Sequence, residues 1–467
     1  MKRAAVLDVE LARFFDRQGP RYTSYPTAVE FHSGVDSATY TDRLTLADAA
    51  EAGQPLSLYV HIPFCEQLCT FCACHVIATP RRDVTRDYLD HLGRELELLS
   101  AQLPHRRTLR QMHWGGGTPT YLSVGELESL FAAVTARWTL EPGAELAIEI
   151  DPRVTSIEQL ETLARLGFNR LSMGVQDFTP EVQEAIGRRQ TFAETKALME
   201  AARALGFSEG INFDLIYGLP RQTAASFELS LERLVELRPD RVAIYSFAFV
   251  PWARLHQRRL DAAALPERGE KLALHLMARA RLLGAGYVQV GIDHFALPSD
   301  ELARAAGDAR LARNFMGYTV KESSTLVAAG VSGIGEVAGA FFQNQRKLSS
   351  YYAAIDAGRL PIERGYVLDP DDRIRQFVIR ELLCNFAVDR NAVGASFGVD
   401  FDGYFETARA EIRQLEAESG VRLLDEAGSR LVLTEAGRLF ARNVCMAFDR
   451  YLTARQESGR QSYSRTI

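Results

Sequence analysis

The sequence lacks a long apolar run, has little lysine, and has few cysteines outside one short segment. No window approaches the ~18–20 uninterrupted apolar residues that a membrane-spanning helix needs. The N-terminal stretch carries Asp8 and Glu10 where a signal peptide would be apolar. We therefore expect a cytoplasmic protein with no membrane span.

Charge limits the classes of partner. The formal net charge is −6, from 54 basic and 60 acidic residues, which argues against a general affinity for nucleic acid or anionic membranes. Only five of the basic residues are lysines, and genome base composition explains the arginine excess better than an anionic ligand does. We expect no nucleic-acid partner.

The cysteines are unevenly distributed. Four of the six, Cys65, Cys69, Cys72 and Cys74, fall within ten residues. In a cytoplasmic protein such a group predicts metal ligands or reactive thiols rather than disulfides. The other two cysteines, at positions 384 and 445, stand in apolar helical contexts and predict small buried side chains.

Short β-branched or aromatic runs alternate with amphipathic stretches from about residue 56 to residue 300 of the 467-residue chain. This alternation predicts an α/β fold with a parallel sheet and helices packed outside it. About six such units fit either a barrel fragment or an open doubly wound sheet. The expected strands are 57–62, 111–115, 145–150, 170–174, 211–217, 241–247 and 287–291, and the expected helices are 84–103, 124–138, 157–166, 192–205, 225–237 and 267–283.

The flanking segments differ from this pattern. Residues 1–55 contain no clear repeating element, and residues 317–345 form a glycine-rich connector. From residue 371 the order helix, helix, hairpin, helix resembles a winged-helix unit, with strands expected within 421–433 and a helix over 434–452. Because residues 371–467 carry 14 arginines against 15 acidic residues, we expect a structural cap or substrate lid rather than a DNA-binding module.

Several expected strands end in polar or glycine-rich segments, where parallel α/β folds place their chemistry. Directly after the first strand, Cys65, Cys69 and Cys72 form a C-x3-C-x2-C sequence. Three thiolates on one loop can bind three irons of a cubane cluster and leave the fourth iron open. A zinc site would need a fourth ligand, which Cys74 or His75 could supply, so zinc remains an alternative.

The C-x3-C-x2-C sequence, with Phe71 before its last cysteine, resembles the signature of radical S-adenosylmethionine enzymes. Further segments resemble the family of oxygen-independent coproporphyrinogen III oxidases, and this similarity covers nearly the whole chain. The segments are 21–27, 59–65, the adjacent Cys74, 114–120, 172–177, 214–220, 293–295 and 443–446.

The resemblance implies a domain organisation. A partial (β/α)6 barrel with the iron–sulfur cluster would span residues 56–300, with an N-terminal arm over the active site at 1–55. Residues 301–370 would form a connector that completes the active site, and 371–467 a mostly helical, winged-helix-like C-terminal domain.

The resemblance also implies roles for individual residues. Cys65, Cys69 and Cys72 would bind a 4Fe–4S cluster, and Cys74, Tyr59 and His61 are the candidate catalytic residues. Glycines at 116 and 117 would let the backbone approach the methionine end of the cofactor. Contacts to the cluster-bound S-adenosylmethionine are expected from Tyr59, Gly116, Glu149 and Ile334, and contacts to a second S-adenosylmethionine from Phe71, Gly117, Thr118, Gln176, Arg188, Asp214 and Ala248.

The implied reaction is the oxidative decarboxylation of two propionates of coproporphyrinogen III to the vinyl groups of protoporphyrinogen IX. Arg188 suits a carboxylate through a bidentate fork, and Arg21 is the first candidate anchor for a substrate propionate. We expect a small-molecule tetrapyrrole substrate, an electron donor such as flavodoxin or ferredoxin, and a monomer.

Two segments depart from the family pattern. Residues 246–249 read Ser-Phe-Ala-Phe and residues 315–320 read Phe-Met-Gly-Tyr-Thr-Val, so each has apolar side chains where the family usually has polar ones. The alternatives are therefore a related enzyme that transfers a methyl or adenosyl group to another tetrapyrrole or substrate, or a haem-binding trafficking protein without decarboxylase activity.

Overall fold

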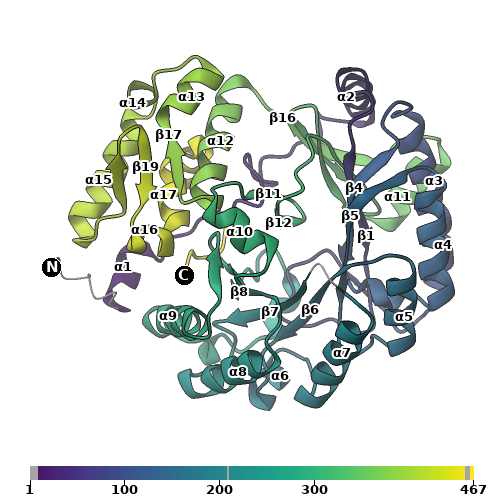
Figure 1. Cartoon of the computed structure of the whole chain (residues 1–467), viewed down its shortest axis with the longest axis horizontal. Helices are drawn as coiled ribbons and strands as arrows, with labels where there is room; N and C mark the ends of the chain where they lie inside the picture. Colours follow the sequence, from purple (N-terminus) through teal and green to yellow (C-terminus); the bar gives the residue numbers. More distant parts are fainter. Residues whose placement is uncertain (1–8, 208–209, 458–462) are drawn as a thin grey trace.

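The computed structural model describes residues 9–207, 210–457 and 463–467, so the first eight residues of the expected arm lie outside it. One large sheet with helices on its outer face forms the main body, and a smaller unit built from the last hundred residues lies to one side (Figure 1). No helix of the described residues combines the length and the apolar character that crossing a membrane requires.

Six parallel strands in chain order form the centre of the sheet, as the alternating pattern predicts. The strands are β1 (Leu56–Ile62), β4 (Thr108–Gly116), β5 (Thr139–Ile150), β6 (Arg170–Gln176), β7 (Ile211–Tyr217) and β8 (Arg241–Ser246). In β6 and β7 buried apolar residues alternate with half-buried ones along much of the strand, because successive side chains point to opposite faces of the sheet.

Helices connect these strands and cover the outer face of the sheet (Figure 1). Their starts are set by local side chains; for example, Ser156 accepts a hydrogen bond from the backbone N–H of Gln159 and so caps α5. The helices are α3 (Val84–Ala101), α4 (Val124–Thr135), α5 (Ile157–Arg165), α6 (Pro180–Ala185), α7 (Phe192–Ala204), α8 (Ala224–Leu237) and α9 (Arg268–Gly284).

The sheet is open, because its described order runs from β16 at one edge to β9 at the other, β16-β15-β14-β13-β1-β4-β5-β6-β7-β8-β10-β9. This identifies the partial (β/α)6 barrel and excludes a closed one. The expected strand at 287–291 is β9 (Val288–Val290), which runs in the same direction as β8. It does not pair with β8, because β10 (His294–Ala296) lies between them in the sheet and is antiparallel to both, so that β9 pairs antiparallel with β10. The turn between them is too short for a parallel crossover.

The glycine-rich stretch 317–345 contributes strands to the main sheet, which its sequence did not indicate. Gly335 has no space for a side chain, because a Cβ there would lie 2.6 Å from the carbonyl oxygen of Leu326. In this part β13 runs parallel to β1, and the next three strands are antiparallel. The elements are α10 (Glu301–Gly307), β11 (Ala312–Asn314), β12 (Gly317–Thr319), β13 (Leu326–Ala329), β14 (Ile334–Val337), β15 (Ala340–Asn344), α11 (Leu348–Asp356) and β16 (Ile362–Val367).

The C-terminal unit contains the expected hairpin, β18 (Leu424–Ala427) with β19 (Arg430–Leu433), and adds β17 (Ala387–Asp389) as a third strand. The helix expected over 434–452 is divided into α16 (Glu435–Leu439), α17 (Ala441–Ala447) and α18 (Arg450–Glu457). The remaining helices of this unit are α12 (Pro370–Cys384), α13 (Arg390–Phe397), α14 (Phe401–Tyr404) and α15 (Glu406–Ser419).

The N-terminal arm packs against both the main sheet and the C-terminal unit. Its helix α2 (Ser37–Ala50), which the sequence did not indicate, contacts β14 and β16. The preceding short helix α1 (Ala12–Phe15) is buried in the core of the C-terminal unit, where the rings of Phe15 and Phe440 stack with centroids 3.8 Å apart. Both ends of the chain therefore contribute to one hydrophobic core.

Candidate active site

The cysteine loop follows β1 at the carboxyl end of the parallel strands and begins with the short strand β2 (Phe64–Cys65). Cys69 is buried, Cys65 and Cys72 are half-buried, and Cys74 is exposed. Backbone bonds fix the bend, including those from the Cys72 N–H to the Cys69 carbonyl (3.2 Å) and from the Thr70 N–H to the Ile186 carbonyl (3.1 Å). The three expected ligands thus lie on one restrained loop.

Two side chains from the segment after β8 also bond to the backbone of the cysteine loop. His256 Nε2 donates to the carbonyl oxygen of Cys72 over 2.7 Å. Gln257, which is fully buried, donates to the carbonyl oxygens of Phe71 (3.0 Å) and Ala248 (3.1 Å). Neither residue belongs to a recognisable motif, so the sequence did not identify them.

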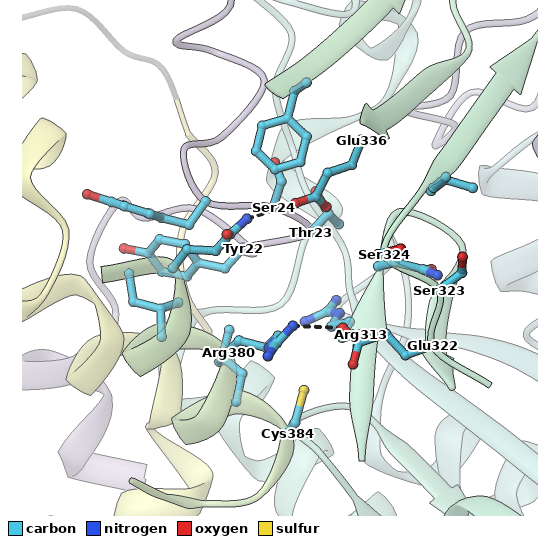
Figure 2. A pocket seen from close by; sticks show the side chains of 17 residues that line it. Tyr22, Thr23, Ser24, Arg313, Glu322, Ser323, Ser324, Glu336, Arg380 and Cys384 are labelled. Atoms are coloured by element: carbon cyan, nitrogen blue, oxygen red, sulfur yellow. Dashed lines mark hydrogen bonds and ion pairs between the residues drawn. The ribbon is translucent and has the colours of Figure 1, made fainter. Parts of the chain in front are cut away.

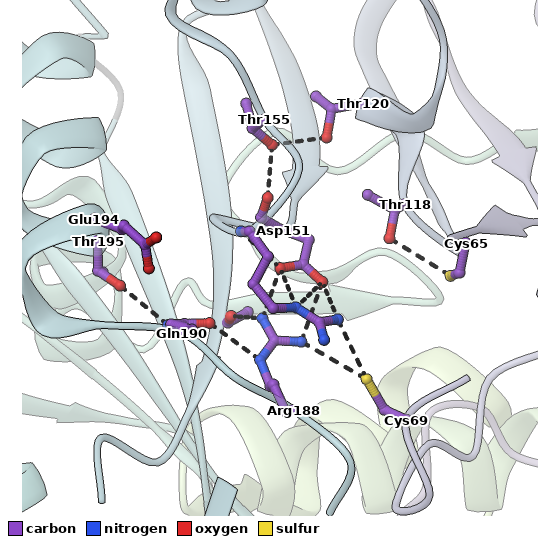
Figure 3. A network of polar contacts seen from close by, with 12 residues as sticks. Cys65, Cys69, Thr118, Thr120, Asp151, Thr155, Arg188, Gln190, Glu194 and Thr195 are labelled. Atoms are coloured by element: carbon purple, nitrogen blue, oxygen red, sulfur yellow. Dashed lines mark hydrogen bonds and ion pairs between the residues drawn. The ribbon is translucent and has the colours of Figure 1, made fainter. Parts of the chain in front are cut away.

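Cationic and hydroxyl donors approach the cysteine sulfurs (Figure 3). Arg153 Nη2 lies 3.4 Å and Arg188 Nη1 lies 3.9 Å from Cys69 Sγ, and Thr118 Oγ1 lies 3.5 Å from Cys65 Sγ. Such donors favour the thiolate form that binds metal, although at Cys65 burial outweighs the Thr118 bond and raises the pKa to about 12. The donor set therefore fits an anionic iron–sulfur cluster.

The zinc alternative would require a fourth side chain closed around the same ion as the three cysteines. Within the described part of the chain, no group of three or more histidine, cysteine, aspartate or glutamate side chains is placed to hold a metal ion.

Arg188 is already bound to a carboxylate of the chain. It is 4% exposed, and its Nη1 and Nη2 donate to the two oxygens of Asp151 over 3.2 and 3.0 Å (Figure 3). Burial raises the pKa of Asp151, but the charge of Arg188 and the bonds from Arg153 outweigh this and hold the pKa below its usual value. The guanidinium of Arg188, which was expected to bind a cofactor carboxylate, therefore binds the carboxylate of Asp151.

Glycines after β4 allow close packing. A Cβ on Gly116, whose φ is +113°, would lie 2.5 Å from the ring of His61, and a Cβ on Gly117 would lie 2.6 Å from the backbone of Pro63 and Phe64. The sequence predicted an approach of this backbone to the cofactor. The structure adds that a side chain at either glycine would collide with the segment that leads into the cysteine loop.

Tyr59 and His61 form a chain of hydrogen bonds beneath Cys74. The Tyr59 hydroxyl lies 3.1 Å from His61 Nδ1, and His61 Nε2 donates to the His75 carbonyl oxygen over 3.0 Å. Burial lowers the pKa of His61 to about 4, so the imidazole is neutral near neutral pH. With both ring nitrogens bonded, His61 positions the segment that carries Cys74.

Glu149 and Asp214 line one cavity of about 130 Å³, together with Tyr245 and His294. Glu149 accepts bonds from the Gly116 N–H (3.0 Å) and His113 Nε2 (3.3 Å). Burial raises the pKa of Glu149, but these bonds outweigh it and keep the pKa below its usual value. Burial raises the pKa of Asp214 to about 6.

The other expected cofactor contacts do not all meet in that cavity. Thr118 and Arg188 line a different cavity, of about 520 Å³, beside Cys65.

Phe71 packs on an apolar cluster that contains Phe247, one of the residues that depart from the family pattern. Ile334 packs on another cluster, with Phe31 and Phe341. Gln176 has a left-handed backbone conformation at the end of β6 (φ +69°).

Arg21, the expected propionate anchor, is engaged within the chain. Its Nη2 donates to Asp293 over 3.1 Å, and its guanidinium lies 4.5 Å from the ring centroid of Tyr245. The arm therefore reaches the carboxyl end of the sheet, but this arginine already has a carboxylate partner.

Two family models match the chain. The model of the Radical SAM superfamily matches residues 59–234, and that of the HemN C-terminal domain matches residues 368–440. The first match contains the cysteine loop and the strands around it, and the second begins beside α12.

Curated and solved relatives match nearly the full length. Oxygen-independent coproporphyrinogen III oxidase from Pseudomonas aeruginosa is 43% identical over 462 residues, covering 98% of each chain. Its counterpart from Escherichia coli is 41% identical over 460 residues, also covering 98% of each. The solved coproporphyrinogen III oxidase (HemN) of Escherichia coli, described as a radical SAM enzyme, superposes with a TM-score of 0.87 at 39% identity and covers 93% of this chain and 100% of its own.

Proposed function

This chain belongs to the family of oxygen-independent coproporphyrinogen III oxidases, and we propose that it converts coproporphyrinogen III to protoporphyrinogen IX. The reaction removes CO₂ and hydrogen from the propionates on rings A and B and leaves two vinyl groups, without oxygen. The observation that carries this proposal is the similarity over 98% of the chain. It favours decarboxylation over methyl or adenosyl transfer and over haem trafficking.

We propose that Cys65, Cys69 and Cys72 hold a 4Fe–4S cluster. With S-adenosylmethionine, this group supplies a 5′-deoxyadenosyl radical, which removes hydrogen from a propionate β-carbon. The chain holds the sulfur ligands in place through Gln257 and His256, which bond to the loop backbone. Arg153 and Arg188 place positive charge beside Cys69 and so stabilise the anionic sulfur.

Glu149 is suited to bind the ammonium group or a ribose hydroxyl of the cofactor. Its carboxylate stays ionised because His113 and the Gly116 N–H bond to it. Tyr59 and Gly116 lie beside it, and Ile334 would supply apolar contact. His61 and Tyr59 hold the Cys74 segment, so we expect Cys74 to act beside the cluster and His61 to position it.

A second S-adenosylmethionine is a further part of the proposal. Phe71, Gly117, Thr118, Gln176, Asp214 and Ala248 would line its site. Because Asp151 occupies the fork of Arg188, we expect Arg188 to shape this region rather than to bind the carboxylate of a cofactor.

The remaining parts of the proposal concern partners. Reduction of the cluster requires a one-electron donor, for which a flavodoxin or ferredoxin is suited. We expect the chain to act as a monomer, since the arm and the C-terminal unit share one core within the chain.

An anaerobic product assay tests this function. Reconstituted, reduced protein is incubated with S-adenosylmethionine and coproporphyrinogen III, and the tetrapyrroles and CO₂ are quantified. We expect protoporphyrinogen IX with two CO₂ released for each molecule formed. Cleavage of S-adenosylmethionine without CO₂ would indicate another radical reaction, and haem binding with neither would indicate a trafficking protein; either result overturns the proposal.

A further inference from the structure

A cavity of about 190 Å³ lies where the N-terminal arm, the β11–β14 segment and α12 meet (Figure 2). Arm residues 22–25 close one side, and Arg313 and Asn314 of β11 lie opposite. The volume is below the ~300–1,000 Å³ of pockets that hold a complete drug-sized ligand. The cavity is therefore suited to one part of a larger molecule.

Arg313 is the unusual residue of this cavity. Its Nε and Nη1 are buried and have no hydrogen-bond partner in the described part of the chain. Its guanidinium lies 4.9 Å from the ring centroid of Tyr318. This contact leaves the N–H groups at the edge of the guanidinium available to a ligand. Arg313 as a whole is half-buried, but buried N–H groups without a hydrogen-bond partner are unfavourable, so they indicate a ligand that supplies one.

Other buried arginines differ from Arg313 in this respect. Arg241 bonds to Asp300 over 2.7 Å, and Arg106 pairs with Glu51 over 2.6 Å. Their charges are balanced by carboxylates of the chain itself.

The carboxylates near Arg313 are already engaged. Asp293 accepts from Arg21 through one oxygen and lies 2.6 Å from His294 Nδ1 through the other. Glu322 pairs with Arg380 over 2.7 Å. Glu336 accepts from Gln376 over 3.2 Å, and burial raises the pKa of Glu336. The partners found for these three carboxylates are thus other side chains than Arg313.

The cavity adjoins the expected reaction site. Asn314 lines both this cavity and the one that contains Glu149 and Asp214. A ligand that extended past Asn314 would reach both Arg313 and Glu149.

Resting on the proposed function, we propose that Arg313 binds the carboxylate of one propionate of the tetrapyrrole substrate and so orients the macrocycle. Planar guanidinium and carboxylate groups form two parallel hydrogen bonds, which fixes direction as well as position. The arm residues and α12 surround this carboxylate and exclude water from it. Arg313 is therefore a substrate-binding residue, in place of Arg21.

The test compares reconstituted wild type with R313Q, R313K and the control R310Q, whose side chain is exposed and pairs with Asp308. Affinities for coproporphyrin III and its uncharged tetramethyl ester are measured by fluorescence titration. We expect R313Q to bind coproporphyrin III at least about 30-fold more weakly, because truncating one partner of a buried ion pair has effects of this size. Affinity for the ester should change little, and R313K should restore part of the loss.

Iron content and thermal unfolding are measured on each variant to exclude a general defect. Without ligand, R313Q should keep its cluster and unfold near the wild-type temperature, because no hydrogen bond is lost. Equal affinity of R313Q and wild type for coproporphyrin III would overturn the role of Arg313 while leaving the proposed function intact. A wild type that neither binds coproporphyrin III nor converts coproporphyrinogen III would instead overturn the proposed function and this inference with it.

Discussion

Single side chains determine the geometry of the cysteine loop. Gln257 bonds to two carbonyl oxygens from separate segments, and Arg188 joins Asp151 to the surroundings of Cys69. These contacts hold the backbone of the loop in one geometry, which is the property that a precise site requires.

Replacing Cys69 by alanine should remove the cluster. The variant leaves only two thiols of the C-x3-C-x2-C sequence, and one iron of the cubane loses its protein ligand. We expect loss of bound iron, acid-labile sulfide and visible absorption after anaerobic reconstitution. The control is Cys384→Ala, because Cys384 is buried far from this sequence in α12. A full complement of iron in the Cys69 variant would contradict the ligand assignment.

Replacing Arg188 by glutamine should destabilise the fold. Arg188 and Asp151 form a buried bidentate pair, with side chains 4% and 11% exposed. Removing Arg188 leaves Asp151 bonded to Arg153, so the free energy of unfolding should fall by less than the ~3–5 kcal/mol expected for a carboxylate with no remaining partner. Chemical denaturation measures this, with the exposed neighbour Arg189→Gln as control. Equal losses in the two variants would mean that the pair contributes no stability.

The sequence identified residues whose spacing or type carries information by itself. The cysteines and the glycines after β4 are of this kind. Partner choice is different, because the pairing of Arg188 with Asp151 or of Gln257 with two carbonyls depends on segments brought together only by folding. A lone arginine or glutamine has no local signal that predicts its partner.

At the scale of elements, Glu95 joins α3 to three neighbours. It accepts from the Gly330 N–H (2.7 Å), Asn344 Nδ2 (2.6 Å) and the Tyr351 hydroxyl (2.5 Å). These partners lie after β13, at the end of β15 and in α11. One buried carboxyl therefore connects the first helix of the barrel to the strands that extend the sheet.

Stability should depend on the protonation of Glu95. Burial raises the pKa of Glu95 from 4.5 to about 7, so the folded state keeps a proton that the unfolded state releases. Its contribution to the free energy of unfolding is therefore greatest below the unfolded pKa and falls as pH rises through the folded pKa, by up to about 3 kcal/mol. Urea unfolding of Glu95→Gln at about pH 5 and about pH 7.5 should lack this decrease. The exposed Glu97→Gln should retain it, and parallel pH profiles of wild type and Glu95→Gln would contradict the assignment.

The elements with strong periodicity were predicted, and those without it were not. Long strands such as β7, followed by amphipathic helices such as α8, have a clear pattern. The strands β11 to β16 are short, and their register depends on pairing with β1 and with one another. The early start of β5 at Thr139 was missed because its first residues are largely exposed and polar.

At the scale of the whole molecule, the two ends of the chain are interdependent. Tyr22 donates to Asp449 over 2.9 Å, and Phe15 stacks on Phe440. The arm also supplies residues 22–25 to the cavity of Arg313. The C-terminal unit therefore fixes the arm in the position that closes this cavity.

Replacing Phe15 by alanine should loosen this arrangement. Phe15 is fully buried, and truncating a buried phenylalanine costs about 3–5 kcal/mol. We expect faster proteolysis within the arm and weaker binding of coproporphyrin III, with the cluster retained. Phe14→Ala, at the half-buried neighbour, is the control and should have a smaller effect. An arm as resistant to protease as in wild type would contradict the shared core.

The central claim is that the site removes hydrogen from the propionate β-carbons of a tetrapyrrole as CO₂ leaves. The most direct measurement uses coproporphyrinogen III deuterated at those carbons, with mass spectrometry of the nucleoside product and quantification of CO₂. The account predicts deuterium in 5′-deoxyadenosine and an equal amount of CO₂. Deuterium-free 5′-deoxyadenosine together with intact propionates would contradict it.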